Sequence, residues 1–216
     1  MTNRITITII LLIILTSFFI GIFLYPKMPS IIASHWNTEG QVNGFITKFW
    51  ALFLMPFISL LLFLLFILIP KIDPLRENIK KFIKYYNLFI LFIILFLFYL
   101  YLLTIFWNLG FIFNMNLALT PAFAILFYCA GNLIKNAKRN WFIGIRTPWT
   151  LSNDKVWDET HKIGGNLFKA VGIIALLGVF FPNYAIFFLI IPAIIVSVYT
   201  FIFSYFEYQK EIKKIK

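Results

Sequence analysis

Side chains that could do chemistry gather in one polar stretch, residues 131–165. It holds His161, with Asp158 one helical turn earlier, and an imidazole beside a carboxylate is the arrangement of a general base. The hydroxyls nearby, on Ser152 and Thr160, are too common in proteins to indicate a nucleophile. We therefore interpret His161 first as a packing or surface residue of a helix and keep the general base as the alternative.

Arg146 lies within the run GIRTPWTL of the same stretch. Its guanidinium, with the Thr147 hydroxyl, could hold a phosphate or a carboxylate. An equal alternative is structural: Arg146 caps the carbonyls of a helix C-terminus while Trp149 lies in the membrane interface. Pro148 biases its predecessor towards extended backbone, and Gly144 permits a positive φ. We expect a fixed, non-helical loop that presents Arg146 and Trp149 side by side.

A second polar stretch, residues 26–48, holds His35 and Glu39 four residues apart. On a helix they would share a face, as two metal ligands do. Zinc takes three or four protein ligands, and His161 is expected on the opposite side of the membrane. We therefore expect no metal site and no cofactor.

The simplest interpretation of residues 26–48 is an interfacial loop. Trp36 would lie at headgroup depth, and Gly40 and Gly44 would be turn residues. The alternative is a recognition surface that faces outside. Its candidate residues are Pro29, His35, Trp36, Asn37, Gly40 and Gly44.

The elements that must position these stretches are long apolar runs. Of 216 residues, 62% are hydrophobic and 12% are charged, against roughly 25% charged in soluble domains. The chain has too little polar surface for a water-soluble fold, which predicts an all-α integral membrane protein. A spanning helix needs about 20 apolar residues. The six predicted spans are Ile5–Tyr25, Phe49–Ile69, Tyr85–Trp107, Leu117–Ile134, Asn166–Phe181 and Ala185–Phe206.

A short interfacial helix is predicted after residue 152. Ser152-Asn153-Asp154 has the residue types that begin a helix, and Gly164-Gly165 has those that end one. The helix would lie on the cytoplasmic face with Trp157 and His161 on one side of it. Beyond it, Pro182-Asn183-Tyr184 would divide the last apolar run into two spans.

The placement of lysine and arginine predicts the orientation. One side carries 17 of the 19 basic residues: Arg4, loops 70–84 and 135–165, Lys169, and the tail that ends in Lys216. That side is expected to be cytoplasmic, with both termini on it. The uneven split accounts for the net charge of +11 without direct nucleic-acid binding.

The loop contents suggest a division into units. We expect a two-span unit over residues 1–70 with the outer loop 26–48, a cytoplasmic linker over 71–84, and a four-span unit over 85–216 with the motif loop 131–165. Linker residues Asp73 and Glu77, mixed with lysines, are typical of a surface segment. Apart from Lys169 at one edge, the span interiors lack the ionisable residues that ion-coupled transporters need.

Both polar stretches resemble known sequences. The ordered residues of 131–165 closely resemble the SdpI family of bacterial membrane proteins, and Pro26, Pro29, His35-Trp36-Asn37, Gly40, Gly44 and Lys48 resemble the small domain of unknown function that commonly precedes it. The matching residues that we single out are Asn132, Asn140, Gly144, Arg146, Thr147, Pro148, Trp149, Thr150, Trp157 and His161.

The resemblance implies a non-enzymatic, multi-pass protein of the cell membrane that confers immunity to a secreted, membrane-active peptide toxin. It also implies a signalling role, in which the toxin-engaged protein holds an autorepressor at the membrane. Two alternatives stay open. One is an enzyme or carrier for a lipid or small amphiphile at the cytoplasmic leaflet, with Arg146 on the headgroup and His161 as base. The other is a lipid-packed scaffold without a ligand.

Overall fold

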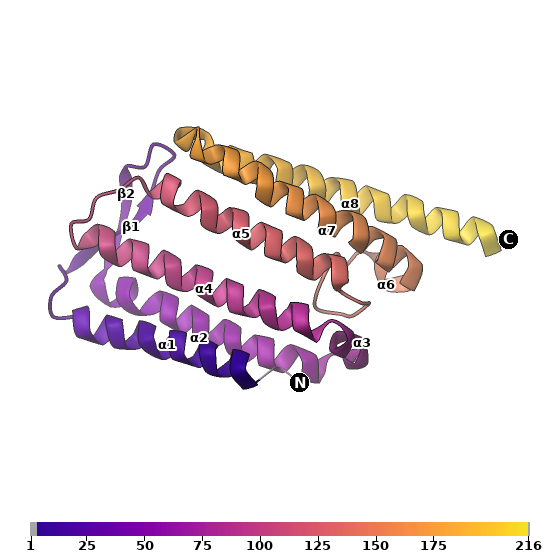
Figure 1. The fold of residues 1–216 in the computed structure, drawn as a ribbon, viewed down its shortest axis with the longest axis horizontal. Coiled ribbons are helices and arrows are strands. Elements are labelled where there is room, and N and C mark those ends of the chain that lie inside the picture. The colour runs from indigo at the N-terminus through magenta and orange to yellow at the C-terminus, as the bar shows by residue number, and fades with distance from the viewer. Residues whose placement is uncertain (1–3, 216) are drawn as a thin grey trace.

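The computed structural model describes residues 4–215, and Lys216 of the predicted tail lies outside them. Six long helices run side by side (Figure 1), joined by short segments and one two-stranded sheet. The elements in chain order are α1 (Arg4–Leu24), β1 (Ile31–Trp36), β2 (Val42–Thr47), α2 (Lys48–Ile72), α3 (Arg76–Lys81), α4 (Ile83–Asn108), α5 (Met115–Asn136), α6 (Pro148–Ser152), α7 (Asp154–Ala175), the 3₁₀ segments Leu176–Val179 and Pro182–Tyr184, and α8 (Ala185–Ile215).

All six long helices are long and apolar enough to cross a membrane, and the chain is a multi-pass membrane protein. The six predicted spans are thereby confirmed, as is the break at Pro182–Tyr184. Figure 1 shows two distinct ends of the bundle. We call the end with α3, α6, the 137–147 loop and both termini the basic end, and the end with β1, β2 and the 182–184 turn the hairpin end.

The prediction that Gly164-Gly165 ends a short interfacial helix is wrong. Helix α7 runs unbroken from Asp154 to Ala175, so the predicted interfacial helix is the first part of the fifth span. The reason is packing against α5. A Cβ at Gly165 would lie 2.6 Å from the Lys135 backbone nitrogen, and one at Gly131 would lie 2.6 Å from the Gly165 carbonyl oxygen. These glycines allow two backbones to touch, which offsets their low helix propensity.

Residues 31–47, within the predicted interfacial loop 26–48, form a β-hairpin. Strands β1 and β2 pair antiparallel, with Ile32 opposite Ile46 and His35 opposite Gly44. Gly40, with φ 78°, is a turn residue as predicted. Gly44 is not, because it lies within β2, where a Cβ would come 2.8 Å from the His35 Cβ. The all-α prediction thus misses one small sheet.

Side-chain amides attach the hairpin to both sides of the bundle. Asn108, the last residue of α4, accepts from the Ala33 N–H at 2.9 Å and donates to the Ala33 carbonyl at 3.0 Å. On α5, Asn116 Nδ2 donates to the Thr38 carbonyl at 2.7 Å and to the Asn37 carbonyl at 3.2 Å. The hairpin therefore bridges the groups formed by α1, α2, α4 and by α5, α7, α8.

Candidate functional site

The predicted motif residues at the basic end form a loop with its own hydrogen bonding. Asn140 is fully buried. Its Nδ2 donates to the carbonyls of Lys138 and Ile143 at 2.8 and 2.9 Å, and its Oδ1 accepts the N–H groups of Phe142 and Ile143 at 2.9 and 2.7 Å. One amide thus satisfies four backbone groups, and its role in this loop is structural.

His161 closes the same loop from α7. Its Nε2 accepts the Ile145 N–H at 2.9 Å, so that nitrogen carries no proton, and its Nδ1 donates to the Trp157 carbonyl at 2.8 Å. The ring stacks on the Trp157 indole at a centroid distance of 3.9 Å, and Trp157 Nε1 donates to the Ala137 carbonyl at 2.8 Å. With both nitrogens engaged and 1% of its surface exposed, the imidazole is placed as a packing residue.

Gly144 makes this contact with the imidazole possible. Its φ of 116° is one that L side chains rarely adopt. A Cβ there would collide with His161 Nε2. The two motif residues are therefore coupled sterically, although 17 positions separate them in the chain.

The expected non-helical loop is in part helical. Thr147 is the N-cap of α6 in a reciprocal capping box with Thr150, and Pro148 takes the first helical position, where a missing N–H costs nothing. The Thr147 hydroxyl also lies 3.0 Å from the Ser204 hydroxyl of α8. Trp149 packs against α8, with its ring 5.1 Å from Phe201 and 5.2 Å from Tyr205.

Arg146 and Asn132 take more peripheral positions. The Arg146 side chain is exposed, and its Nη1 donates to the Trp141 carbonyl at 2.6 Å. That carbonyl belongs to the loop and not to a helix end, so the contact differs from the predicted helix cap. Asn132 lies half-buried in the last turns of α5, where its carbonyl accepts from Asn136 Nδ2 at 2.8 Å.

Asp73, which was not among the predicted site residues, fastens the loop to the other half of the bundle. Asp73 is 2% exposed, so it is not the solvated linker residue that was predicted. Its Oδ2 accepts the Trp141 N–H at 2.9 Å, and its Oδ1 accepts the Leu75 N–H at 2.6 Å. Beside it, Asn78 Nδ2 donates to the Arg139 carbonyl at 2.8 Å. No local pattern marks Asp73, because its partner Trp141 lies 68 residues away.

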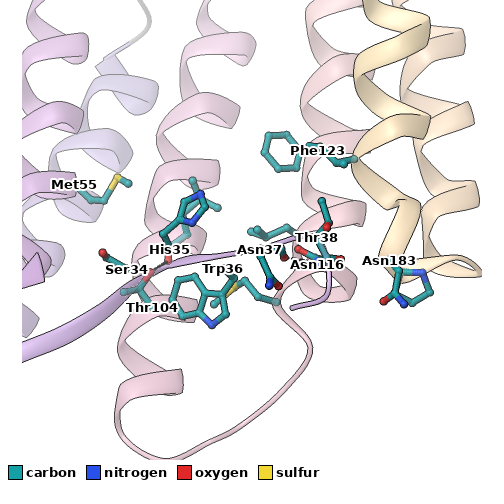
Figure 2. Close-up of a pocket in the computed structure, with 15 residues that line it drawn as sticks. Ser34, His35, Trp36, Asn37, Thr38, Met55, Thr104, Asn116, Phe123 and Asn183 are labelled. Carbon is teal, nitrogen blue, oxygen red and sulfur yellow. Dashed lines mark hydrogen bonds between the residues drawn. The ribbon is translucent and has the colours of Figure 1, made fainter. Parts of the chain in front are cut away.

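At the hairpin end, an open cavity of about 610 Å³ lies between the two halves. Figure 2 shows its lining, which comes from the hairpin and α4 on one side and from α5 and the 182–184 turn on the other. The deep wall is apolar and includes Met55, Leu100, Leu119, Phe123 and Ile186. The rim is polar but carries no Asp, Glu, Lys or Arg. Its members are Ser34, His35, Asn37, Thr38, Asn116 and Asn183.

Three of the six residues proposed for outer recognition line this cavity. They are His35, Trp36 and Asn37. His35 Nδ1 lies 2.5 Å from Asn43 Oδ1, which fixes the ring and leaves Nε2 free of any partner among the described residues. Pro29 is exposed outside the lining, while Gly40 and Gly44 shape the strands that carry these side chains.

The two histidines lie at opposite ends of the bundle, on β1 and near the start of α7. Within residues 4–215 no group of three or more His, Cys, Asp or Glu side chains could hold a metal ion.

Comparison with known proteins identifies both polar stretches. Residues 136–205 match the model of the SdpI/YfhL protein family, and residues 12–60 match a domain of unknown function (DUF1648). The chain is 28% identical over 201 residues to "Immunity protein SdpI" of Bacillus subtilis (strain 168), covering 93% of this chain and 94% of that protein. The resemblance predicted from the motifs is confirmed. No solved structure matches the chain.

Proposed function

We propose that this membrane protein, with its SdpI/YfhL segment behind a DUF1648 segment, protects its cell from a secreted, membrane-active peptide. The observation that carries the proposal is the similarity to an immunity protein over nearly the whole length of both chains. Because the match includes all six helices, it supports a shared architecture as well as a shared motif.

We infer that the protein acts by binding and not by catalysis. The enzyme alternative needs His161 as a free base, and both ring nitrogens are engaged with backbone groups. Asp158, its proposed partner, forms an ion pair with Lys138 at 3.0 Å instead. The contacts of His161 and Asp158 thus indicate that these residues stabilise the folded loop and do not form a reaction centre.

The proposal assigns the hairpin end to the outside. Basic side chains gather at the opposite end, as the positive-inside rule requires for a cytoplasmic face. Reporter fusions test the assignment: alkaline phosphatase inserted at Thr38 should be active, and the same enzyme inserted at Asn153 should be inactive. Equal activity at the two positions would refute it.

The survival test is direct. The chain should be expressed in a toxin-sensitive bacterium and challenged with several purified membrane-active peptides. We expect survival to rise at least about tenfold for one of them, relative to cells that express an unrelated six-span protein at equal abundance. No gain for any peptide, with the protein present in the membrane, would contradict the proposal.

We further propose that the basic end can hold a repressor, as the family resemblance implies. Arg146 is exposed there beside Trp141, which is 51% exposed, and Phe142, which is 38% exposed. Exposed arginine and aromatic side chains in one loop are a composition enriched in protein interfaces. Replacing Arg146 by Ala should abolish recruitment of a repressor to membranes and leave toxin survival unchanged. Loss of both together would argue for a purely structural residue.

A further inference from the structure

We propose that the cavity at the hairpin end binds the uncharged end of an apolar peptide helix inserted in the membrane. This inference rests on the proposed immunity function and specifies the part of the toxin that is recognised.

The size and wall of the cavity fit bulky apolar side chains. Its volume of about 610 Å³ lies within the range of roughly 300–1,000 Å³ that is usual for small-molecule ligand sites. Met55, Leu100, Leu119 and Phe123 form an uncharged wall that continues from the bundle interior. An aromatic or leucine side chain at the end of a membrane helix would leave its contacts with lipid and contact these wall residues instead.

The polar rim fits the backbone of a helix end. The last four carbonyls of a helix have no intrahelical partner, and near the hydrocarbon region such groups must find partners in protein. The Asn183 amide has no hydrogen bond to any described residue, and neither has His35 Nε2. Both side chains line the rim (Figure 2), so the Asn183 amide is an unpaired donor at the place where carbonyls would arrive. His35 Nε2 is an acceptor, because Nδ1 donates to Asn43 Oδ1, and it suits an amide or indole N–H of the same helix end.

The charge pattern disfavours a phospholipid as the occupant. A lipid phosphate needs cations or several donors, and no lysine or arginine lines the cavity. The two lysines of the hairpin end lie over aromatic rings elsewhere: Lys27 Nζ is 3.8 Å from the Phe23 ring centroid, and Lys48 Nζ is 4.6 Å from that of Tyr25. An uncharged, amide-bearing end is therefore the better complement.

The test uses the full chain in phosphatidylcholine nanodiscs. The probe is a synthetic helix of about 20 leucine and alanine residues with a tryptophan and an amidated C-terminus at one end and a dye at the other. Binding is followed by energy transfer to a dye on the scaffold protein of the nanodisc, with empty nanodiscs as background. A second probe ends in lysine, and we expect it to bind at least about tenfold more weakly.

Matched variants on one helix locate the site. Leu119→Trp fills the cavity and should weaken probe binding at least about tenfold. Leu117→Trp lies two residues away on α5, is 40% exposed and is not part of the lining, so it should change binding less than about twofold. His35→Phe and Asn183→Leu remove hydrogen bonds at similar volume and should each weaken binding roughly three- to tenfold.

The outcomes separate this inference from the proposed function. If the chain protects cells but Leu119→Trp binds the probe and protects as well as wild type, the cavity assignment is overturned and immunity stands. If no peptide is resisted, immunity itself fails. If phosphatidylglycerol in the nanodisc displaces the probe, a lipid is the occupant and the peptide assignment is overturned.

Discussion

Replacing Gly144 by alanine should destabilise the protein through one identifiable contact. Gly144 has φ 116°, and its added Cβ would meet His161 Nε2. That nitrogen is the acceptor for the Ile145 N–H. The substitution therefore imposes backbone strain, overpacks a buried ring and breaks a hydrogen bond, all within one turn of the loop.

The three costs can be estimated separately. A non-glycine residue at such a φ costs about 1–2 kcal/mol, overpacking costs about 1–3 kcal/mol, and leaving a buried donor unpaired costs about 1–3 kcal/mol. Together they predict a loss of at least about 3 kcal/mol. Gly110→Ala is the matched control, because Gly110 has φ 98° with nothing within 4 Å of an added Cβ. It should lose only the strain cost.

The assay is the free energy of unfolding in detergent micelles, followed by tryptophan fluorescence. The decisive measurement is a double-mutant cycle, because His161→Ala removes the atom with which the new Cβ collides. In that background Gly144→Ala should cost about 1–2 kcal/mol, as Gly110→Ala does in wild type. Equal costs in both backgrounds would refute the steric explanation.

Three further substitutions probe other contacts. In Asp73→Asn the amide N–H₂ must face either the Trp141 N–H or the Leu75 N–H, so one of these donors loses its acceptor. The free energy of unfolding should fall by about 1–3 kcal/mol, and proteolysis of the 137–147 loop should become faster. Gly165→Leu should push α5 away from α7 and lower the amount of folded protein in membranes. The control Ile173→Leu, on the exposed face of α7, should leave that amount unchanged. Similar amounts of the two variants in membranes would contradict the packing argument. Lys155→Ala removes an exposed lysine from its ion pair with Glu211, which keeps Lys214 as a partner, and should change stability by less than about 1 kcal/mol.

The sequence predicts spans well, because a membrane leaves few solutions for an apolar run of helical length. Local signals were also reliable where the relevant partner is near in the chain. Asn153 was predicted to begin a helix, and its side chain accepts the Lys155 and Val156 N–H groups at 2.9 and 3.1 Å. Trp157 and His161 were placed on one face by their spacing, and their rings stack.

Failures occur where a distant partner decides the local structure. Glycine has low helix propensity, so Gly164-Gly165 indicated a helix end, but contact with Gly131 across the helix pair makes a small residue necessary there. Asp73 looked solvated because its neighbours are charged, and only the fold brings the Trp141 N–H to it. The hairpin was missed because residues 31–36 lack the polar–apolar alternation that predicts a strand.

The polar groups at the basic end are paired within the protein, whereas several at the hairpin end are not, and this difference bears on where a toxin would bind. At the basic end Asn140 makes four hydrogen bonds and His161 two, so the polar groups of these two side chains stabilise the fold of the loop. At the hairpin end Asn183 and the free nitrogen of His35 face a cavity without a partner among residues 4–215. Both side chains are exposed, so they are available to pair with the polar groups of a ligand. Toxin recognition is therefore expected at the hairpin end, while at the basic end Asp73 and Asn78 fasten the 137–147 loop to the other half of the bundle.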